Sequence, residues 1–256
     1  MDQHLLGFWP EGIKSFCSGR LGGFSTGAYA SLNLGHHVGD DPYAVNANRE
    51  SYRERIGAKP VFLDQVHGWS LVELTDQTPD GISADICITH ESGLACTVMV
   101  ADCLPVLLAE STGQWVAAAH AGWRGLAGEE GLGVIEVAVQ AMRERMNADV
   151  SQIQVWLGPC IGPQAFEVGH EVREAFCAVD AQASQCFQPG PSTDKWWADL
   201  PALARRRLQA LGVKQIAGND GSAAWCTVAQ KDLFFSHRRD RISGRFAASI
   251  WRDSAD

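Results

Sequence analysis

Two stretches of the 256-residue sequence decide its fold: Ala101-Asp102-Cys103-Leu104-Pro105 and His120-Ala121-Gly122-Trp123-Arg124-Gly125. An apolar, strand-like run at Thr97–Leu108 contains the first, and a second run at Trp115–His120 ends at the second. Between the runs lies Glu110-Ser111-Thr112-Gly113, which has the composition of a turn. The two runs are therefore predicted to form a β-hairpin that brings the reactive side chains of both stretches together.

The register of this hairpin determines whether Cys103 meets His120. If the turn centres on Ser111-Thr112, the two residues lie directly opposite each other, with Cβ atoms about 5 Å apart. At that distance they can share a metal ion or a proton. A one-residue slip in either strand would send one of the two side chains to the other face. Ser-Thr is not a preferred two-residue turn, so a longer loop with a bulge is the alternative.

A thiolate beside an imidazole fits two kinds of site. The first is a catalytic metal centre of Cys103, His120 and a third ligand, with an open position for water. His67 is the natural third ligand because it precedes a glycine that allows close approach. Zinc suits such a Cys/His₂ set, and copper is the competitor. The second kind of site is a Cys103 nucleophile activated by His120 as a base.

The remaining pattern mixes helices and strands. The predicted helices are Tyr43–Ile56, which follows Asp41 as N-cap and Pro42, and Gly131–Met146, Phe166–Val179 and Pro201–Leu211. Further predicted strands are Lys59–Leu63, Leu71–Leu74, Ile153–Leu157 and Ile216–Ala217. These elements do not alternate regularly, which favours an α+β fold over a doubly wound parallel sheet. Without repeats or a long linker, residues 1–256 are expected to form a single catalytic domain.

Charge and composition exclude several classes of function. A net charge of −9 argues against nucleic acid as a partner, because phosphate backbones require a basic face. The eight cysteines include no C-x-x-C pair, which disfavours a zinc ribbon or a thioredoxin-like redox site. No G-x-G-x-x-G or P-loop motif is present. Most of these cysteines are expected to be reduced, buried residues.

The sequence also bears on localisation. The longest apolar runs, such as Val98–Ala101 and Val116–Ala119, are far too short to cross a bilayer. The N-terminus Met1–His4 has no basic segment of the kind that begins a secretory signal. We therefore expect a cytoplasmic protein with no membrane partner. No interface pattern is evident, and a monomer is expected.

Two further segments are candidate anion sites. Gly122–Gly125 precedes a helical stretch and carries Arg124, which together suit an anion; the alternative is a structural turn with the arginine in solvent. Near the C-terminus, Phe234-Phe235 and Arg238-Arg239 combine aromatic and basic side chains that could hold a base and a phosphate. The alternative for this segment is a solvated basic loop.

Taken together, these segments resemble one family, called the polyphenol-oxidase or laccase-domain family and also described as bacterial purine nucleoside phosphorylase with adenosine deaminase activity. The similarity covers nearly the whole chain, and His120–Gly125 combined with Gln65–Gly68 is its most specific part. The similar segments are Ser31–Gly35, Val45 with Asn48-Arg49, Gln65–Gly68, Ala101–Cys103, His120–Gly125, Gly158–Val168, Phe235-Ser236, Arg238-Arg239 and Gly244-Arg245.

The resemblance implies an α+β fold with a β-sandwich flanked by helices. It implies zinc ligands at His67, Cys103 and His120, and it implies that Arg49 lines the active site. His237 departs from the family, which usually has tyrosine there.

The implied reactions are phosphorolysis of adenosine, inosine and guanosine, cleavage of methylthioadenosine, and deamination of adenosine. The partners would be purine nucleosides and phosphate. Asp102 could shuttle a proton, or it could cap backbone groups at the end of a strand. The candidate catalytic residues are thus Cys103, His120, Arg49 and Asp102, and the candidate substrate- and phosphate-binding residues are Arg49, Arg124, Gly122 and Arg238.

Two other functions compete. Multicopper oxidation of phenols requires roughly ten ligands, mostly paired histidines. This chain has eight histidines and one His-His pair, His36-His37, which argues against that chemistry although a single copper ion could oxidise phenols weakly. The other competitor is a Cys–His hydrolase of peptide or amide bonds, such as those of peptidoglycan precursors. His67→Ala discriminates between them, because only a metal enzyme should lose activity with its metal.

Overall fold

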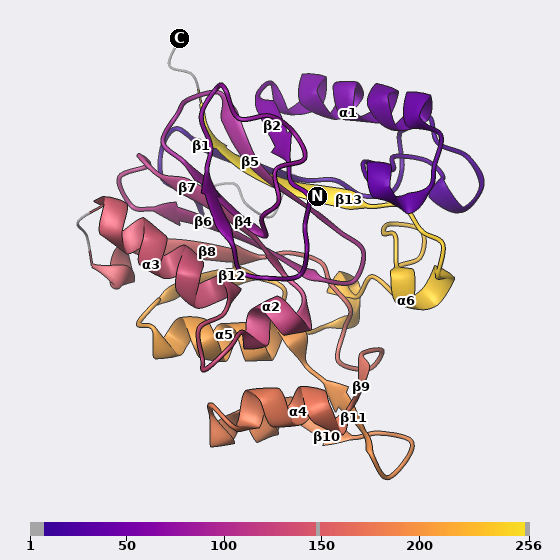
Figure 1. Ribbon diagram of the computed structural model, residues 1–256, viewed down its shortest axis with the longest axis vertical. Coiled ribbons are helices and arrows are strands. Elements are labelled where there is room, and N and C mark those ends of the chain that lie inside the picture. The colour runs from indigo at the N-terminus through magenta and orange to yellow at the C-terminus, as the bar shows by residue number, and fades with distance from the viewer. Residues whose placement is uncertain (1–7, 147–148, 254–256) are drawn as a thin grey trace.

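Two β-sheets packed face to face form the centre of the protein. The computed structural model describes residues 8–146 and 149–253, so Met1–His4 lies outside the described residues. Helices cover the outer face of each sheet (Figure 1). The predicted α+β class, with sandwich-like sheets flanked by helices, is confirmed. None of the described helices is both long and apolar enough to span a membrane.

The two main sheets differ in size and strand direction. The first has the order β1-β13-β5-β2, and its strands are β1 (Ile13–Cys17), β13 (Phe246–Arg252), β5 (Leu94–Val100) and β2 (Lys59–Phe62). The second has the order β12-β8-β6-β7-β4-β3, and its strands are β12 (Gln215–Gly218), β8 (Ile153–Leu157), β6 (Leu104–Glu110), β7 (Val116–Ala121), β4 (Ile86–Thr89) and β3 (Leu71–Glu73). A small third sheet joins β10 (Phe187–Pro189), β11 (Lys195–Ala198) and β9 (Glu167–Gly169).

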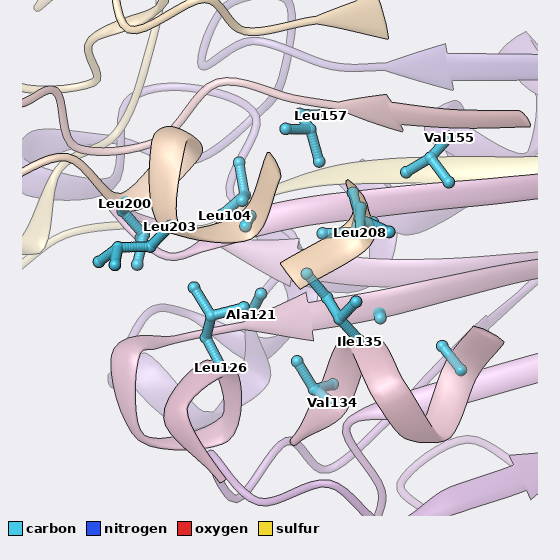
Figure 2. Packing of buried hydrophobic residues seen from close by; sticks show 14 of the residues in the cluster. Leu104, Ala121, Leu126, Val134, Ile135, Val155, Leu157, Leu200, Leu203 and Leu208 are labelled. Carbon is cyan, nitrogen blue, oxygen red and sulfur yellow. The ribbon is translucent and has the colours of Figure 1, made fainter. Parts of the chain in front are cut away.

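The second sheet is buried on both faces. Along β6, Leu107 points into the sandwich core, whereas Val106 and Leu108 join the cluster beneath the helices. That cluster includes residues of α3 (Val134–Met146) and α5 (Leu200–Ala210). Figure 2 shows some of its members: Leu104 and Leu157 of the sheet, Val134 and Ile135 of α3, and Leu200, Leu203 and Leu208 of α5. Double burial explains why β6 is a continuous apolar run and does not alternate apolar with polar residues.

The outer face of the first sheet is covered by α1 (Pro42–Ile56). Tyr52 and Ile56 of this helix pack in a core cluster with Phe62 and Trp251. The predicted N-cap is confirmed, because the Asp41 side chain accepts a hydrogen bond from the backbone N–H of Tyr43. The helix ends at Gly57 in the left-handed region, with φ of 65°.

The prediction of one strand over Thr97–Leu108 was wrong. Strand β5 ends at Val100 in the first sheet, and β6 begins at Leu104 in the second. The chain crosses from one sheet to the other at Ala101–Cys103, and Asp102 has a φ of 88° there. Apolar residues continue through most of this crossing because both sheets bury them, so hydrophobicity alone does not reveal the break.

The predicted hairpin exists, but with a different register. Its partners include Pro105 opposite His120 and Ala109 opposite Val116, so Cys103 does not face His120 and lies beyond the end of the ladder. The turn is displaced toward Gly113, whose φ of 70° suits glycine. A shift of two residues leaves alternating side chains on their original face, and Cys103 still approaches His120.

Two predicted helices begin too early. Helix α3 begins at Val134, not at Gly131, which has a φ of 85°. Helix α4 covers His170–Cys177, because Glu167–Gly169 instead forms β9 against β11. Helix α5 and strands β2, β3, β7, β8 and β12 match their predicted positions to within about one residue. Strands β1, β4, β9, β10, β11 and β13 and the short helix α6 (His237–Asp240) were not predicted. Helix α2 (Trp123–Ala127) begins within the Gly122–Gly125 segment, which was expected to precede a helical stretch.

The Glu110 carboxylate stabilises the turn of the β6–β7 hairpin. It is 2 % exposed and accepts hydrogen bonds from the backbone N–H groups of Thr112 at 2.7 Å and Trp115 at 3.2 Å, and from that of Gln114. Burial raises the pKa of this carboxyl, but the hydrogen bonds outweigh burial and lower the pKa below its ordinary value. The folded protein therefore holds this group deprotonated more readily than the unfolded chain does.

Glu110→Gln should lower the free energy of unfolding at pH 7 by about 1–3 kcal/mol, because buried N–H donors lose a charged acceptor. The stabilisation that the Glu110 carboxylate gives the folded protein is fully present above about pH 4.3, the pKa of a glutamate in the unfolded chain. It disappears as pH falls through the lower pKa that Glu110 has in the folded protein. Urea denaturation at several pH values should show the two proteins converging in acid. The exposed Glu54→Gln is the matched control. A constant difference at every pH would contradict this prediction.

Candidate metal centre

Three potential metal ligands converge where the two sheets meet. His67 follows β2, Cys103 immediately precedes β6, and His120 lies in β7. One ligand atom from each lies within 4.8 Å of the others, and the two imidazole rings are 4.8 Å apart at 75°. His120 is buried, Cys103 is partly buried and His67 is exposed. The structure thus brings together the three residues that the sequence singled out.

A buried carboxylate orients both histidines. Asp85, which directly precedes β4, is fully buried, and its Oδ1 lies 2.7 Å from Nδ1 of His120. The same carboxylate accepts hydrogen bonds from the backbone N–H groups of His67 at 3.0 Å and Gly68 at 2.7 Å. These bonds hold His67 in the left-handed region, with φ of 62°. Asp85 therefore fixes one histidine through its ring and the other through its backbone.

Asp85 was not predicted as a site residue. Its only signal is an acidic residue directly before the apolar run Ile86-Cys87-Ile88, a position where a buried carboxylate requires partners.

The charges within this group favour a thiolate. Burial raises the pKa of Cys103, but the positive charge of His120 and hydrogen bonds from both histidines outweigh burial and bring it to about 6. Burial lowers the pKa of His120, whereas the Cys103 thiolate and the Asp85 carboxylate raise it to about 9. The two charges therefore favour each other: the imidazolium lowers the pKa of Cys103, and the thiolate raises the pKa of His120.

Glycines make room for this cluster. A Cβ on Gly122 would lie 3.0 Å from Cδ2 of His67 and 3.2 Å from Sγ of Cys103. A Cβ on Gly125 would lie 2.6 Å from the carbonyl oxygen of Gly68, which is closer than real Cβ atoms approach. The glycines of the His120–Gly125 segment thus allow its backbone to pack directly against the Gln65–Gly68 segment.

The donor set fits a metal ion. One thiolate and two imidazoles, oriented by a carboxylate behind one ring, are the ligand types of catalytic zinc sites. Within the described residues, His67, Cys103 and His120 form the only group of three or more such side chains with metal-binding proximity. This group could therefore bind a single metal ion.

The cluster opens into a cavity of about 420 Å³. A volume of this size lies in the range of small-molecule sites. Apolar side chains and several cationic or imidazole side chains share its walls. The lining residues are His37, Gln65, His67, Met99, Val100, Ala101, Asp102, Cys103, His120, Gly122, Trp123, Arg124, Ile161, Phe166, Leu200, His237, Arg238 and Arg245.

The remaining predicted residues have different positions. Gly122, Arg124 and Arg238 line the cavity, as does His237, which is exposed at the start of α6. Arg124 is exposed and stacks on the Trp123 ring at 4.5 Å. Arg238 donates through Nη1 to the carbonyl oxygen of Glu167 at 3.0 Å.

Arg49 does not line the cavity. Its Nε donates to the carbonyl oxygen of Leu34, its Nη1 pairs with Asp80 at 3.2 Å, and its guanidinium lies 4.0 Å from the centre of the Phe62 ring. These contacts engage the Arg49 guanidinium on several sides. The geometry therefore favours a structural role for Arg49 over a role as a phosphate ligand.

Asp102 is a cavity residue whose two carboxylate oxygens are both engaged. Oδ1 accepts from the Thr227 hydroxyl at 2.6 Å, and Oδ2 accepts from the backbone N–H of Arg238 at 2.6 Å. This arrangement favours the capping role over a proton shuttle. It ties the start of α6 to the point where the chain crosses between the sheets.

Comparisons with known proteins identify relatives that match nearly the whole chain. Residues 14–253 match the family described as multi-copper polyphenol oxidoreductase laccase. The chain is 46% identical over 256 residues to purine nucleoside phosphorylase YfiH of Escherichia coli K12, covering 98% of this chain and 99% of that protein. It is 43% identical over 253 residues to a purine nucleoside phosphorylase of Pseudomonas aeruginosa, covering 98% and 99%.

A solved structure has the same fold. Neisseria meningitidis protein NMB0706 is 42% identical and superposes with a TM-score of 0.87 over 96% of each chain. The chain therefore belongs to the laccase-like polyphenol oxidoreductase family that its motifs resemble.

Proposed function

We propose that this protein is a metal-dependent purine nucleoside phosphorylase acting on adenosine, inosine, guanosine and methylthioadenosine. The observation that carries the proposal is the combination, in one cavity of about 420 Å³, of the His67–Cys103–His120 group with an apolar wall and the cationic side chains of Arg124, Arg238 and Arg245. A purine requires the apolar wall, phosphate requires the cations, and the ribose lies between them. The names of the relatives point to the same activity.

The reaction balances without a further reactant. A phosphate oxygen forms a bond to C1′ of the ribose, and the C1′–N9 bond breaks with its electron pair passing to the purine. The purine takes up the proton that the hydrogen phosphate carried, which leaves free base and ribose 1-phosphate. Because positive charge develops on the sugar, the chain must hold the phosphate and the ribose in line.

His67, Cys103 and His120 would hold the metal, and zinc is the ion that their chemistry suits best. When bound, zinc would supply a Lewis acid for polarising substrate oxygens or activating water. The chain itself orients these ligands through Asp85 and excludes bulk water with apolar walls such as Phe166 and Leu200. Trp123, with Arg124 stacked on it, offers an aromatic face for the purine.

Deamination of adenosine is a second activity of the same cavity. It replaces the C6 amino group by an oxygen from water and releases ammonia, for which an activated water near C6 is sufficient. The metal that His67, Cys103 and His120 would hold could activate this water. Adenosine is therefore the most informative substrate, because its two fates give different products.

The two competing functions remain as alternatives. A Cys–His hydrolase would use the Cys103 thiolate, whose pKa of about 6 suits a nucleophile, with His120 as the acid or base. A copper-dependent phenol oxidase would agree with the family description. However, three ligands provide for one metal ion, whereas a multicopper site requires many more.

We further propose that residues 1–256 act as one catalytic domain, that the protein functions in the cytoplasm, and that it is a monomer. The continuous sandwich, whose first sheet combines β1 and β13 from opposite ends of the chain, supports the first of these proposals.

Metal-loaded protein should convert adenosine to adenine and ribose 1-phosphate only when phosphate is present, and to inosine with or without phosphate. Chelation or Cys103→Ala should abolish both reactions, because the metal loses its thiolate. Chromatography with mass spectrometry measures the products, and plasma mass spectrometry measures bound zinc and copper.

His67→Ala separates the alternatives in the same assay. A metal enzyme should lose metal and nucleoside turnover together, whereas a Cys–His hydrolase should retain cleavage of peptide substrates. The control is Cys177→Ala, a partly buried cysteine that does not line the cavity. No turnover of adenosine, inosine or guanosine by loaded wild-type protein would sink the phosphorylase proposal.

Asp85→Asn should weaken zinc binding by roughly 10- to 100-fold, because the amide cannot accept all the hydrogen bonds that orient both histidines. A competition titration with a chromogenic chelator measures this affinity directly. Asp64→Asn, at a neighbouring exposed carboxylate, is the matched control. Unchanged zinc affinity in the Asp85 variant would show that it does not position the ligands.

A further inference from the structure

The cationic side chains that line the cavity differ in their contacts and in the part of the wall to which they belong. Arg124 is exposed and stacks on Trp123. Arg238 donates to two backbone carbonyl oxygens and lies 5.6 Å from the centre of the Phe166 ring. Both belong to the wall that carries the aromatic side chains. Arg245 instead lies beside His37, in a part of the wall formed by segments from the two ends of the chain.

Arg245 is held at its backbone by Asn33. The Asn33 Oδ1 accepts from the backbone N–H of Arg245 at 2.8 Å, and the carbonyl oxygen of Arg245 accepts from the backbone N–H of Leu34 at 2.9 Å. Asn33 is itself fully buried, and its carbonyl oxygen accepts from Nδ2 of Asn48 at 2.8 Å. In Figure 1 the yellow segment around α6 lies beside the indigo loop that precedes α1. The hydrogen bonds between the two segments fix the backbone position of Arg245, from which its side chain extends into the cavity wall.

Gly35 lets Arg245 and His37 meet. A Cβ on Gly35 would lie 2.9 Å from Cγ of Arg245 and 3.4 Å from Cε1 of His37. Both side chains therefore pack on the same small patch of backbone. The Ser31–Gly35 segment of the family resemblance thus has a function in the fold: it places a guanidinium and an imidazole side by side in the cavity wall.

The Arg245 guanidinium is only partly engaged. Nη1 donates to the carbonyl oxygens of Ser243 at 2.8 Å and Gly244 at 3.0 Å. Within residues 8–146 and 149–253, Nε and Nη2 have no hydrogen-bond partner, and no carboxylate forms a salt bridge with the side chain. Burial lowers the pKa of Arg245, and the negative charges of Cys103 and Asp102 offset this effect only in part. A partly buried guanidinium with free donors is a strong receptor for a phosphate.

We propose that Arg245 and His37 form the subsite for inorganic phosphate, with Asn33 and Gly35 as positioning residues. This proposal rests on the proposed phosphorolysis and specifies where its second substrate binds. Arg245 donates two hydrogen bonds to the phosphate oxygens, and the His37 imidazole contributes a third. The nucleoside then lies between this subsite and the Trp123–Phe166 wall, with its ribose facing the phosphate.

Arg245→Met keeps the aliphatic stem that packs on Gly35 and removes the charge. We expect the KM for phosphate to rise on the order of 10- to 100-fold, with a change of less than about threefold in the KM for adenosine. Calorimetric titration with inorganic phosphate should show the same loss, and zinc content should remain at the wild-type level. The control is Arg143→Met, an exposed arginine of α3 outside the cavity lining.

The outcomes distinguish a failure of the proposed phosphate subsite from a failure of the proposed phosphorolysis. A normal phosphate KM in Arg245→Met, or a larger effect from Arg124→Met, would overturn the subsite and leave phosphorolysis intact. Arg245-dependent phosphate binding in a wild-type protein that cleaves no nucleoside would contradict phosphorolysis and leave the subsite standing. If Arg245→Met fails to fold, Arg245→Lys and His37→Leu replace it. Both should raise the phosphate KM, because Lys lacks the paired guanidinium donors and Leu has no donor.

Gly35→Ala tests the positioning role without touching a charged group. The added Cβ must displace the Arg245 stem, so the KM for phosphate should rise by about 3- to 10-fold, whereas zinc content and the KM for adenosine should not change. Gly57→Ala, which alters an open glycine at the end of α1, is the control for a general loss of stability. Equal effects of the two variants on thermal unfolding and on phosphate KM would contradict a positioning role.

Discussion

The site depends on one buried carboxylate. Asp85 accepts hydrogen bonds from the ring of His120 and from the backbone N–H groups of His67 and Gly68, so a single side chain orients a residue of strand β7 and a residue of the loop after β2. A buried charge without such partners would be costly, and here the partners are the groups whose positions matter most. The mutual effect of Cys103 and His120 on their pKa values follows from this arrangement, because Asp85 favours the charged imidazole that in turn lowers the pKa of Cys103.

The crossing between the two sheets at Ala101–Cys103 explains why the cluster forms there. A chain that leaves one sheet and enters another must break its ladder, and the break frees Cys103 from strand pairing. Asp102 stabilises the break by accepting hydrogen bonds from Thr227 and from the backbone of Arg238. The same residue therefore connects the crossing to α6, which brings cationic and imidazole side chains to the cavity. The strain of a positive φ at Asp102 is offset by these contacts.

The sequence predicted the three candidate metal ligands but not the residue that supports them. His67, Cys103 and His120 stand out because each is a reactive side chain beside glycine or acidic neighbours, and the family resemblance names the same residues. The hairpin register was wrong by two residues, since the turn follows the Glu110 carboxylate and the left-handed Gly113, which hydrophobicity does not encode. The double burial of β6 concealed the strand break. Asp85, His37 and the cavity position of Arg245 depend on pairings between distant segments, and no local pattern reveals those.

The two parts of the cavity have different structural origins. In the His67–Cys103–His120 group, His120 lies in β7, Cys103 directly precedes β6 and His67 lies in the loop that follows β2, so the group forms where the two sheets meet. The Arg245 and His37 side chains belong to segments near the two ends of the chain, which are joined to each other through Asn33. A metal ion demands fixed ligand positions, whereas a substrate subsite must admit and release its ligand in every cycle. The proposed phosphate subsite is supported separately from the His67–Cys103–His120 group, so the subsite could change without loss of the proposed metal site.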